Sequence, residues 1–308
     1  MLLIFESLLP VFLIVALGWL LRRYGVIKME QWEGIEQLGF WVLFPTLLFH
    51  ALVNADLKSL ALNGLILAYV MALIILIILL WLVYIKRKDW FGINGPAYSS
   101  IFQTSSRWNA FIALAVMDKL AGPEGLAIVA VVMSFTVLPL NVINILVVAH
   151  TASAAATTWK NTLVIASHNP MIWGAFIGLV VNLLAIPVYD PLLVGTDLIA
   201  RAGLGVGLLA VGAGLRIRSV FNPRPDMWLG LVGKMVLFPV MVFVLCQAFG
   251  LTGVTLTAAV LCASVPTAMN GYIVARKMGG DAELYATTSA AQTLLGLISI
   301  PFFLWLTV

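Results

Sequence analysis

The sequence predicts an all-α membrane protein of ten transmembrane helices, arranged as two inverted five-helix repeats. Long uncharged apolar runs recur from the first residues to the last, 62% of the residues are hydrophobic, and only 10% are charged. The mean hydropathy is +1.08. This composition is typical of a polytopic membrane protein, because a helix needs ~20 mostly apolar residues to cross the hydrocarbon core of a bilayer.

Ten apolar segments have the length of a transmembrane helix. They cover residues 2–21, 35–53, 60–84, 96–117, 124–148, 161–183, 195–215, 227–248, 254–275 and 284–306. The first lacks a basic leading region and a small-residue cleavage site, so we expect a membrane span there rather than a signal peptide. Cys246 and Cys262 both lie in apolar runs, and we expect neither a disulfide nor a metal site from them.

The basic residues predict the orientation of these segments. Lys and Arg follow segments one, three, five, seven and nine, as in Arg22-Arg23, Lys86–Lys88 and Arg276-Lys277. Because such residues concentrate in cytoplasmic loops, we expect both termini on the non-cytoplasmic side of a bacterial inner membrane. The net charge of +4 reflects this asymmetry, and it gives no reason to expect a nucleic-acid partner.

Five helices per half is an odd number, so a second half that resembles the first must enter the membrane with opposite polarity. We therefore expect one repeat at residues 1–148, a short cytoplasmic linker at 149–160, and a second repeat at 161–308. The internal similarity lies in Trp108-Asn109-Ala110-Phe111-Ile112 and Met269-Asn270-Gly271-Tyr272-Ile273, one in each half.

Polar residues interrupt segments four and nine at corresponding places. Since every backbone group in hydrocarbon needs a partner, a broken helix indicates a site inside the protein or beside a water-filled cavity. Asn is a strong N-cap, so we expect Asn109 and Asn270 each to begin a second half-helix. Pro266 explains the break in segment nine, with Gly271 as a further hinge position. Segment four has no proline, so its break depends on the polar run Gln103–Ser106 together with Asn109 and Arg107.

The ends of half-helices do not by themselves decide the charge of a ligand, because N-termini attract anions and C-terminal carbonyls attract cations such as sodium. Neither broken segment contains Asp or Glu, and Arg107 lies two residues before Asn109, so an organic anion is favoured. The expected substrate-binding residues are Arg107, Ser106, Asn109, Thr267, Asn270 and Tyr272. A cation site made of neutral oxygens from Ser105, Ser106, Thr267 and Gln292 stays open.

Each of these residues also has a structural interpretation. Intramembrane Asn can pack helices, and Arg107 can bind unwound carbonyls and hold its break open. His50 and His168 are candidate proton-coupling groups, with interfacial packing as the alternative. Lys234 is expected to extend its amine to the cytoplasmic surface, with contact to a substrate or pairing with a neighbour as the alternative. Arg201 is expected to lie near the outer end of segment seven. No metal site and no cofactor are expected, and coupling to H⁺ or Na⁺ is left open.

Several motifs resemble the auxin efflux carrier family in its bacterial branch. They are Leu9-Pro10-Val11-Phe12, Ala16–Arg23, Phe44–Phe49, the Arg107-x-Asn109-x-Phe111 element and the segment from Pro266 to Asn270. The last two resemble that family's two crossover helices. The similarity extends over nearly the whole chain, and its strength lies in the combination of short motifs.

The resemblance implies a ten-span secondary carrier of organic acids with the fold of bile-acid sodium symporters. Plant members export auxin, and bacterial members are commonly named malonate or malate permeases. Spans 1, 2, 6 and 7 would form a scaffold that often dimerises, and spans 3–5 and 8–10 a moving transport domain. This chain departs from the family at Ala110, where a Gly is frequent, and in lacking a Pro in segment four, which puts the shape of the first pocket in question.

The expected function is therefore secondary transport of a small organic anion, such as a dicarboxylate or an auxin-like carboxylate, by alternating access with an elevator-like sliding domain. An anion channel and a non-transporting ligand receptor are the alternatives. An enzyme is not expected, because the sequence has no His-Glu-x-x-His motif, no Gly-x-Ser-x-Gly motif and no paired intramembrane carboxylates.

Overall fold

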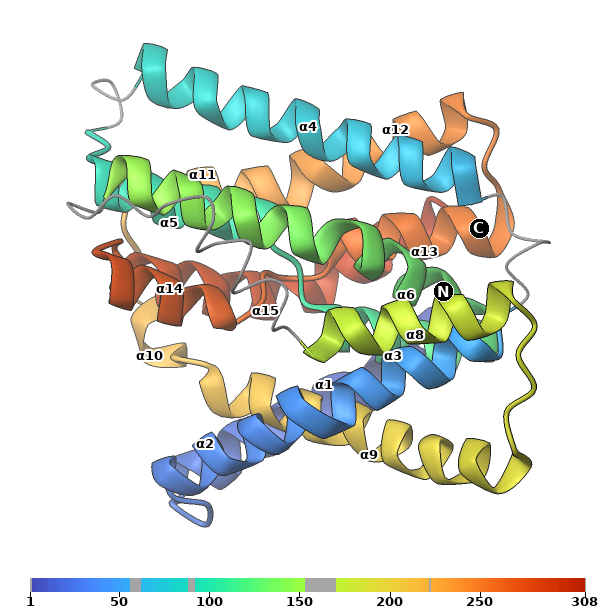
Figure 1. Cartoon of the computed structure of the whole chain (residues 1–308). Helices are drawn as coiled ribbons and strands as arrows, with labels where there is room; N and C mark the ends of the chain where they lie inside the picture. Colours follow the sequence, from blue (N-terminus) through green and yellow to red (C-terminus); the bar gives the residue numbers. More distant parts are fainter. Residues whose placement is uncertain (1, 56–61, 88–91, 153–169, 222, 308) are drawn as a thin grey trace.

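The computed structural model (Figure 1) describes residues 2–55, 62–87, 92–152, 170–221 and 223–307. These residues form helices and no β-strand, which confirms the all-helical class. In chain order the elements are α1 (Leu2–Arg23), α2 (Met29–Leu38), the π-helical turn η1 (Gly39–Leu43), α3 (Phe44–Val53), α4 (Leu62–Arg87), α5 (Gly95–Ser106), α6 (Ala110–Thr151), α8 (Pro170–Leu183), α9 (Asp190–Gly214), α10 (Ile217–Val220), α11 (Met227–Val232), the π-helical turn η2 (Gly233–Leu237), α12 (Phe238–Ala248), α13 (Gly253–Ser264), α14 (Asn270–Met278) and α15 (Ala282–Trp305).

Seven helical stretches of the described residues are long and apolar enough to cross a membrane, and α8 and α13 are shorter apolar helices. Each of the ten predicted segments contains helix, although residues 161–169 of the sixth lie outside the described residues, as does most of the predicted linker at 149–160. The chain is thus a multi-pass helical membrane protein, and the count of ten spans stays a prediction.

Gly122 bends α6 between the predicted segments four and five. Its φ of 55° and ψ of −141° lie in a region that residues with a Cβ rarely adopt, and Pro123 follows it. The bend divides α6 near the boundary that the sequence predicts between segments four and five.

The helices pack in two groups. In the first group α1 lies along α9, and α3 packs against α8 and α9. In the second group α12 packs against α4 and α13, while α6 packs against α5 and α13, and α15 against α5 and α13. Figure 1 shows α1, α2 and α9 in the lower part of the view and α4, α5 and α12 in the upper part. Contacts of α6 with α1, α3 and α9 join the groups.

Glycines allow the close approach of α1 and α9. A side-chain carbon added at Gly18 would overlap the backbone of Leu209, and one added at Gly212 would overlap the backbone of Val15. Small residues at such contacts let membrane helices approach until their backbones touch. Arg22 also donates to the carbonyl of Ala213, at the end of α9.

Two π-helical turns interrupt the second and eighth predicted segments, and both arise from the pattern Gly-x-x-Val-Leu-Phe-Pro at residues 39–45 and 233–239. The amide of Phe44 donates to the carbonyl of Gly39, and the amide of Phe238 to that of Gly233, five residues back in each case. Proline lacks an amide hydrogen and its ring crowds the preceding turn, so a wider turn before it relieves the clash.

Lys234 occupies the second of these turns, and its side chain is fully buried. The expectation that its amine reaches the cytoplasmic surface is therefore wrong. The turn instead directs the amine over the ring of Phe238, with 4.8 Å between Nζ and the ring centroid. Burial of a lysine amine is rare, because its charge is costly in an apolar interior.

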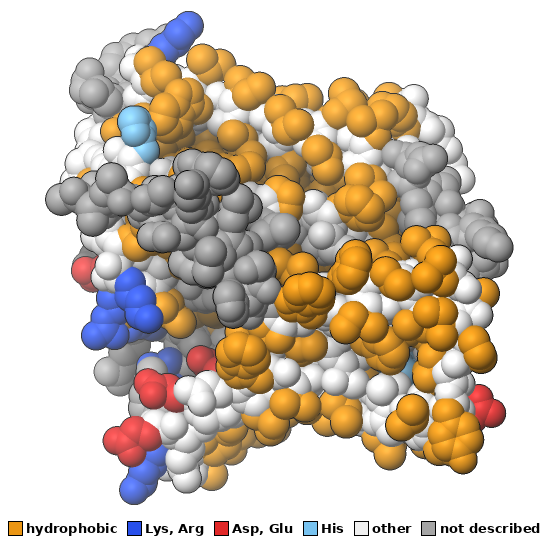
Figure 2. All heavy atoms as spheres, viewed as in Figure 1, with side chains coloured by type: hydrophobic (Ala, Val, Ile, Leu, Met, Phe, Trp, Pro, Cys, Tyr) orange, Lys and Arg blue, Asp and Glu red, His pale blue; other side chains and the backbone are white. Residues whose placement is uncertain are grey.

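Hydrophobic side chains cover much of the face in Figure 2, and charged side chains gather toward its left edge. In Figure 1 the C-terminal ends of α1 and α9 lie at that edge, and both chain termini lie toward the right. An apolar band next to a charged end is the surface that a bilayer requires. Arg201 is exposed and pairs with Asp197 at 2.9 Å, as the structural interpretation of that residue expects.

Candidate functional site

The first helix break lies at Arg107, Trp108 and Asn109, between α5 and α6. Asn109 has an extended backbone (φ −88°, ψ 96°), and its Oδ1 accepts from the amides of Phe111 at 3.1 Å and Ile112 at 3.3 Å. Because these amides have no partner within the helix, the side chain satisfies them locally. The prediction that Asn109 begins a half-helix is confirmed.

The second break lies between Ser264 and Asn270, and it is built differently. Met269 occupies the N-cap position, with no side-chain cap, and Asn270 is already the first residue of α14. α14 thus begins at Asn270 as predicted, but the expected capping by the Asn270 side chain is wrong, because Met269 takes the cap position. Asn270 is exposed, so its amide is available to a ligand rather than used by the backbone.

The two breaks touch each other. The amide of Asn109 donates to the carbonyl of Pro266 at 2.8 Å, and the Thr267 hydroxyl lies 3.5 Å from the carbonyl of Gln103. Pro266 thus contributes its carbonyl to the contact, in addition to removing an amide from α13. Segments far apart in the sequence therefore place the beginnings of α6 and α14 next to one another.

Gln292 of α15 holds both breaks. Its Oε1 accepts from the amide of Thr267 at 2.9 Å, and its Nε2 donates to the carbonyls of Thr104 and Gly230, each at 3.0 Å. The Thr267 amide and the Thr104 carbonyl are groups that an unbroken helix would have paired internally. A fully buried side chain thus replaces helical hydrogen bonds at both breaks.

Tyr285, one turn from the start of α15, supports the second break from the same side. Its hydroxyl donates to the carbonyl of Ala268 and lies 3.2 Å from the hydroxyl of Thr267. Gly271 packs on this side chain, and a Cβ there would overlap the Tyr285 hydroxyl. Gly271 lies within the first turn of α14, so the close approach to Tyr285, rather than an unusual backbone angle, requires glycine.

The start of α15 is itself anchored. Asp281 accepts from the amide of Leu284 at 2.9 Å and from Arg224 at 2.7 Å, and Arg224 also pairs with Asp226 at 2.6 Å. The hydrogen bond to Asp226, followed by that to Asp281, raises the pKa of the Arg224 guanidinium. Arg224 therefore keeps its charge at every physiological pH, and the pairing fixes the helix that carries Tyr285 and Gln292.

Arg107 is a buried cation at the first break, with 5% of its surface exposed. Its Nη1 donates to Oδ1 of Asn141 at 2.7 Å, and its Nε to Oε1 of Gln103 at 3.3 Å. Both partners are neutral amides, and among the described residues no carboxylate forms an ion pair with it. These partners are side-chain amides and not the unwound carbonyls of the structural alternative. Within the described parts of the chain, no carboxylate compensates the positive charge of Arg107.

Ser105 and Ser106 are buried in α5, and each hydroxyl donates to a carbonyl of its own helix at 2.8 and 2.9 Å. Ser106 also donates to Oδ1 of Asn144 at 3.1 Å. Ser105, Ser106, Thr267 and Gln292 are the four residues expected to supply neutral oxygens to a cation. Two of them are hydrogen-bonded directly, because the amide of Thr267 donates to Gln292. The described residues contain no group of three His, Cys, Asp or Glu side chains that could hold a metal ion.

Tyr272 of α14 lies against Arg216, which follows α9. The Arg216 Nη2 donates to the Tyr272 hydroxyl at 2.7 Å, and the guanidinium carbon lies 4.7 Å from the ring centroid. Met269 approaches Gly214 at the end of α9, since a Cβ there would lie 3.0 Å from the Met269 methyl group. The second break therefore meets the first group of helices through Met269 and Tyr272.

His50 lies apart from the breaks, between α3 and α9. Its Nδ1 is 3.0 Å from the hydroxyl of Thr196, and its Nε2 is 3.6 Å from Asp197. These contacts match the packing alternative for this histidine. His168, the other candidate for proton coupling, lies outside the described residues.

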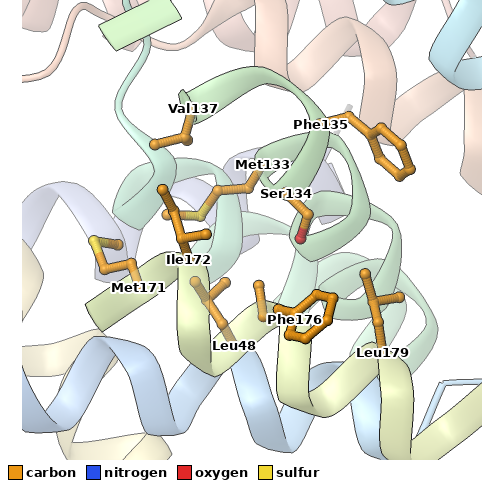
Figure 3. A pocket seen from close by; sticks show the side chains of 10 residues that line it. Leu48, Met133, Ser134, Phe135, Val137, Met171, Ile172, Phe176 and Leu179 are labelled. Carbon is orange, nitrogen blue, oxygen red and sulfur yellow. The ribbon is translucent and has the colours of Figure 1, made fainter. Parts of the chain in front are cut away.

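A cavity of about 190 Å³ lies between α3, α6 and α8 (Figure 3). Apolar side chains line it, including Leu48, Met133, Met171 and Phe176. The one hydroxyl, that of Ser134, donates to a carbonyl of its own helix at 2.7 Å. None of the predicted substrate-binding residues lines this cavity, and its lining offers nothing to an anion.

Sequence reasoning missed several residues of the breaks. They are Asn141, Asn144, Gly230 and Tyr285. Asn141 and Asn144 lie in an apolar run at a spacing of three, which places both on one face of a helix and indicates polar contacts within the membrane. Tyr285 and Gln292 lie seven residues apart, again on one face, whereas no local sequence feature marks Gly230.

Broken apolar helices in contact, with a buried uncompensated cation beside them, define the class of integral membrane proteins that handle polar solutes. The chain belongs to the membrane transport protein family, whose model matches residues 3–304. This confirms the resemblance to auxin efflux carriers.

Relatives give the same class. An "Uncharacterized transporter" of Methanothermobacter thermautotrophicus is 24% identical over 97% of this chain and 96% of that protein. The "Uncharacterized transporter YfdV" of Escherichia coli K12 is 22% identical over 95% of this chain and 93% of its own length. A "Putative malonate transporter" of Rhizobium meliloti is 27% identical over 46% of this chain and 44% of that protein.

Proposed function

We propose that this protein is a secondary transporter that moves a small organic anion across a bacterial inner membrane by alternating access. The substrate is a dicarboxylate such as malonate or malate, or an auxin-like carboxylate. Its carboxylate binds where the two broken helices meet, between the beginnings of α6 and α14. No enzymatic step is part of this function.

The observation that carries the proposal is Arg107. A buried guanidinium with amide partners alone leaves a positive charge in the membrane interior, which costs several kcal/mol unless an anion compensates it. The N-terminal ends of α6 and α14 add partial positive charges at the contact between the breaks. An anionic substrate offsets both.

Asn270 is the side chain best placed to bind and release such a substrate. It is exposed at the first position of α14, and the helix has no side-chain cap. Asn109 acts from the other break by fixing the beginning of α6. The malonate transporter name of the Rhizobium relative supports a small dicarboxylate within this class.

The two packing groups support a division into a static scaffold and a moving domain. The group of α1, α3, α8 and α9 would be the scaffold, through which two copies pair as a homodimer, and the group of α4–α6 with α11–α15 the moving domain. The apolar cavity between α3, α8 and α6 lies at the seam between them (Figure 3), where few polar bonds need to break for sliding. In this arrangement the halves are inverted repeats, segments four and nine are crossover helices, and both termini face away from the cytoplasm.

Uptake into proteoliposomes tests the proposal. A panel of radiolabelled malonate, malate and indole-3-acetate is offered under imposed sodium or proton gradients. We expect saturable uptake and counterflow for at least one anion. Arg107→Gln and Asn270→Ala should raise its KM by roughly 10- to 100-fold, since each removes about 1.5–3 kcal/mol of hydrogen bonding to a charged group.

The matched control is Arg276→Gln. It removes an exposed cation from α14, the helix that begins with Asn270, at a position away from the breaks. Uptake that does not saturate and shows no counterflow would indicate a channel. Binding without flux would indicate a receptor. If Asn109→Ala and Asn270→Ala both left saturable uptake unchanged, the site would lie elsewhere.

A further inference from the structure

Lys234 is a buried basic group that the proposed substrate site does not use. None of its surface is exposed, and its Nζ has no hydrogen-bond partner within the part of the chain that the structure describes. The Nζ atom of Lys234 lies over the ring of Phe238, 4.8 Å from the ring centroid. An ammonium ion in this position lacks both water and a counter-ion, which costs several kcal/mol.

The helices around Lys234 supply no carboxylate that could pair with it. The described residues of α4, α5, α12 and α13 contain neither Asp nor Glu. On the other helices that η2 contacts, Asp226 precedes α11 and is paired with Arg224, and Glu283 lies in the first turn of α15. Among the described residues, no carboxylate forms an ion pair with Lys234.

The helices around Lys234 carry other titratable side chains that are buried. They are Cys262 of α13, Cys246 of α12 and Tyr69 of α4. The Tyr69 ring lies 5.4 Å from that of Phe238, and its buried hydroxyl also has no described hydrogen-bond partner. The amine and the phenol thus share one apolar environment in which neither is stabilised as an ion.

Neighbours of Lys234 in the chain contact residues of both helix breaks. Gly233, its neighbour in the π turn, packs on Ser105 two residues before Arg107. The carbonyl of Gly230, one turn earlier, accepts from Gln292, which also binds the amide of Thr267. Occupation of the breaks by an anion therefore acts on the helix that carries Lys234. π turns inside helices frequently occur at functional sites.

We propose that Lys234 is the proton-coupling group: its amine is neutral in this conformation and accepts one proton when an organic anion occupies the breaks. This inference rests on the proposed function. The amine lone pair takes a proton from water on the side of entry, and the resulting ammonium returns it to water on the other side when the anion leaves. Because linkage is reciprocal, protonation and anion binding strengthen each other, which couples anion movement to one H⁺.

The transport test uses Lys234→Met, which removes the amine and keeps an unbranched side chain one atom shorter. Lys277→Met on the exposed part of α14 is the control. In wild type, a gradient of one pH unit, acid outside, should accumulate malonate up to about tenfold. Lys234→Met should lose this accumulation while malonate–malonate exchange at uniform pH continues. Lys277→Met should behave as wild type.

The outcomes separate the two proposals. If wild type takes up neither malonate, malate nor indole-3-acetate, the proposed function fails. If wild type takes up malonate saturably but indifferently to the pH gradient, or if Lys234→Met still accumulates it as wild type does, the assignment of Lys234 fails while the transporter stands.

A second measurement does not depend on transport or on the ligand. Unfolding exposes the amine to water, where it takes up a proton, so the stability of wild type relative to Lys234→Met should rise as the pH is raised from 6 to 9. Melting temperatures in detergent measure this difference. A difference that stays constant over that range would mean that the buried amine is already charged, which overturns the inference.

Discussion

At Asn109 the chain caps its own second helix, whereas between Val265 and Met269 the neighbouring helix α15 supplies the support. At the first break, the amides that begin α6 are satisfied by a side chain two and three residues away, although Gln292 also binds the Thr104 carbonyl at the end of α5. At the second break, Gln292 and Tyr285 satisfy partners 25 and 17 residues away. The locally capped start of α6 keeps its hydrogen bonds when α15 moves. The second break loses its support when α15 moves against it.

The difference also divides the polar groups between structure and ligand. Asn109 is buried and its Oδ1 accepts from two backbone amides, while Asn270, its counterpart in the sequence, is exposed and does not cap α14. The first asparagine thus builds the site, and the second is the one proposed to bind the substrate. Changes at these positions should separate loss of stability from loss of substrate affinity.

The largest effect is expected for Gln292→Leu. The substitution leaves the Thr267 amide and the carbonyls of Thr104 and Gly230 buried without this partner, at about 1–3 kcal/mol for each unsatisfied group. Thermal unfolding in detergent should show a loss of several kcal/mol, together with the loss of saturable uptake.

Thr293→Val is the control for Gln292→Leu, because the Thr293 hydroxyl is buried one position further along α15 and donates only to the carbonyl of Ser289, at 2.9 Å. It should cost less than about 1 kcal/mol. Equal destabilisation by the two variants would show that Gln292 fills space rather than holding the breaks.

The next effect is expected at the first break. Asn109→Ala removes the acceptor of two helix amides and should destabilise the protein by about 0.5–2 kcal/mol, while Asn109→Ser, which keeps a capping oxygen, should recover part of this. Thermal unfolding of the two variants and wild type measures the difference. If serine is no better than alanine, the cap is not what holds the beginning of α6.

Features that depend on residues close together in the sequence could be predicted, whereas features that depend on packing between distant helices could not. The positions of both breaks and the cap at Asn109 depend on neighbours within three residues, and the sequence predicts them. The support by Gln292 and Tyr285 depends on packing between distant helices, and pattern reasoning finds Gln292 only as a polar residue in an apolar run. The burial of Lys234 depends on the π turn, whose signal is the repeated Gly-x-x-Val-Leu-Phe-Pro pattern.

A smaller effect is expected for Tyr285→Phe at the second break. The ring still fills its place against Gly271, but the hydroxyl no longer donates to the carbonyl of Ala268. The free energy of unfolding should fall by about 1 kcal/mol, and uptake should persist with a changed KM, because the Gln292 contact remains. Complete loss of folding would mean that this hydroxyl, rather than Gln292, carries the second break.

The smallest effect on stability is expected for Asn270→Ala. Because the side chain is exposed and caps no amide, its removal should change the free energy of unfolding by less than about 0.5 kcal/mol, while the KM for the transported anion rises. Thermal unfolding and uptake measured on the same preparation give both numbers. A variant that is destabilised as strongly as Asn109→Ala would show that the two asparagines play the same structural role, and the division between a building residue and a binding residue would be lost.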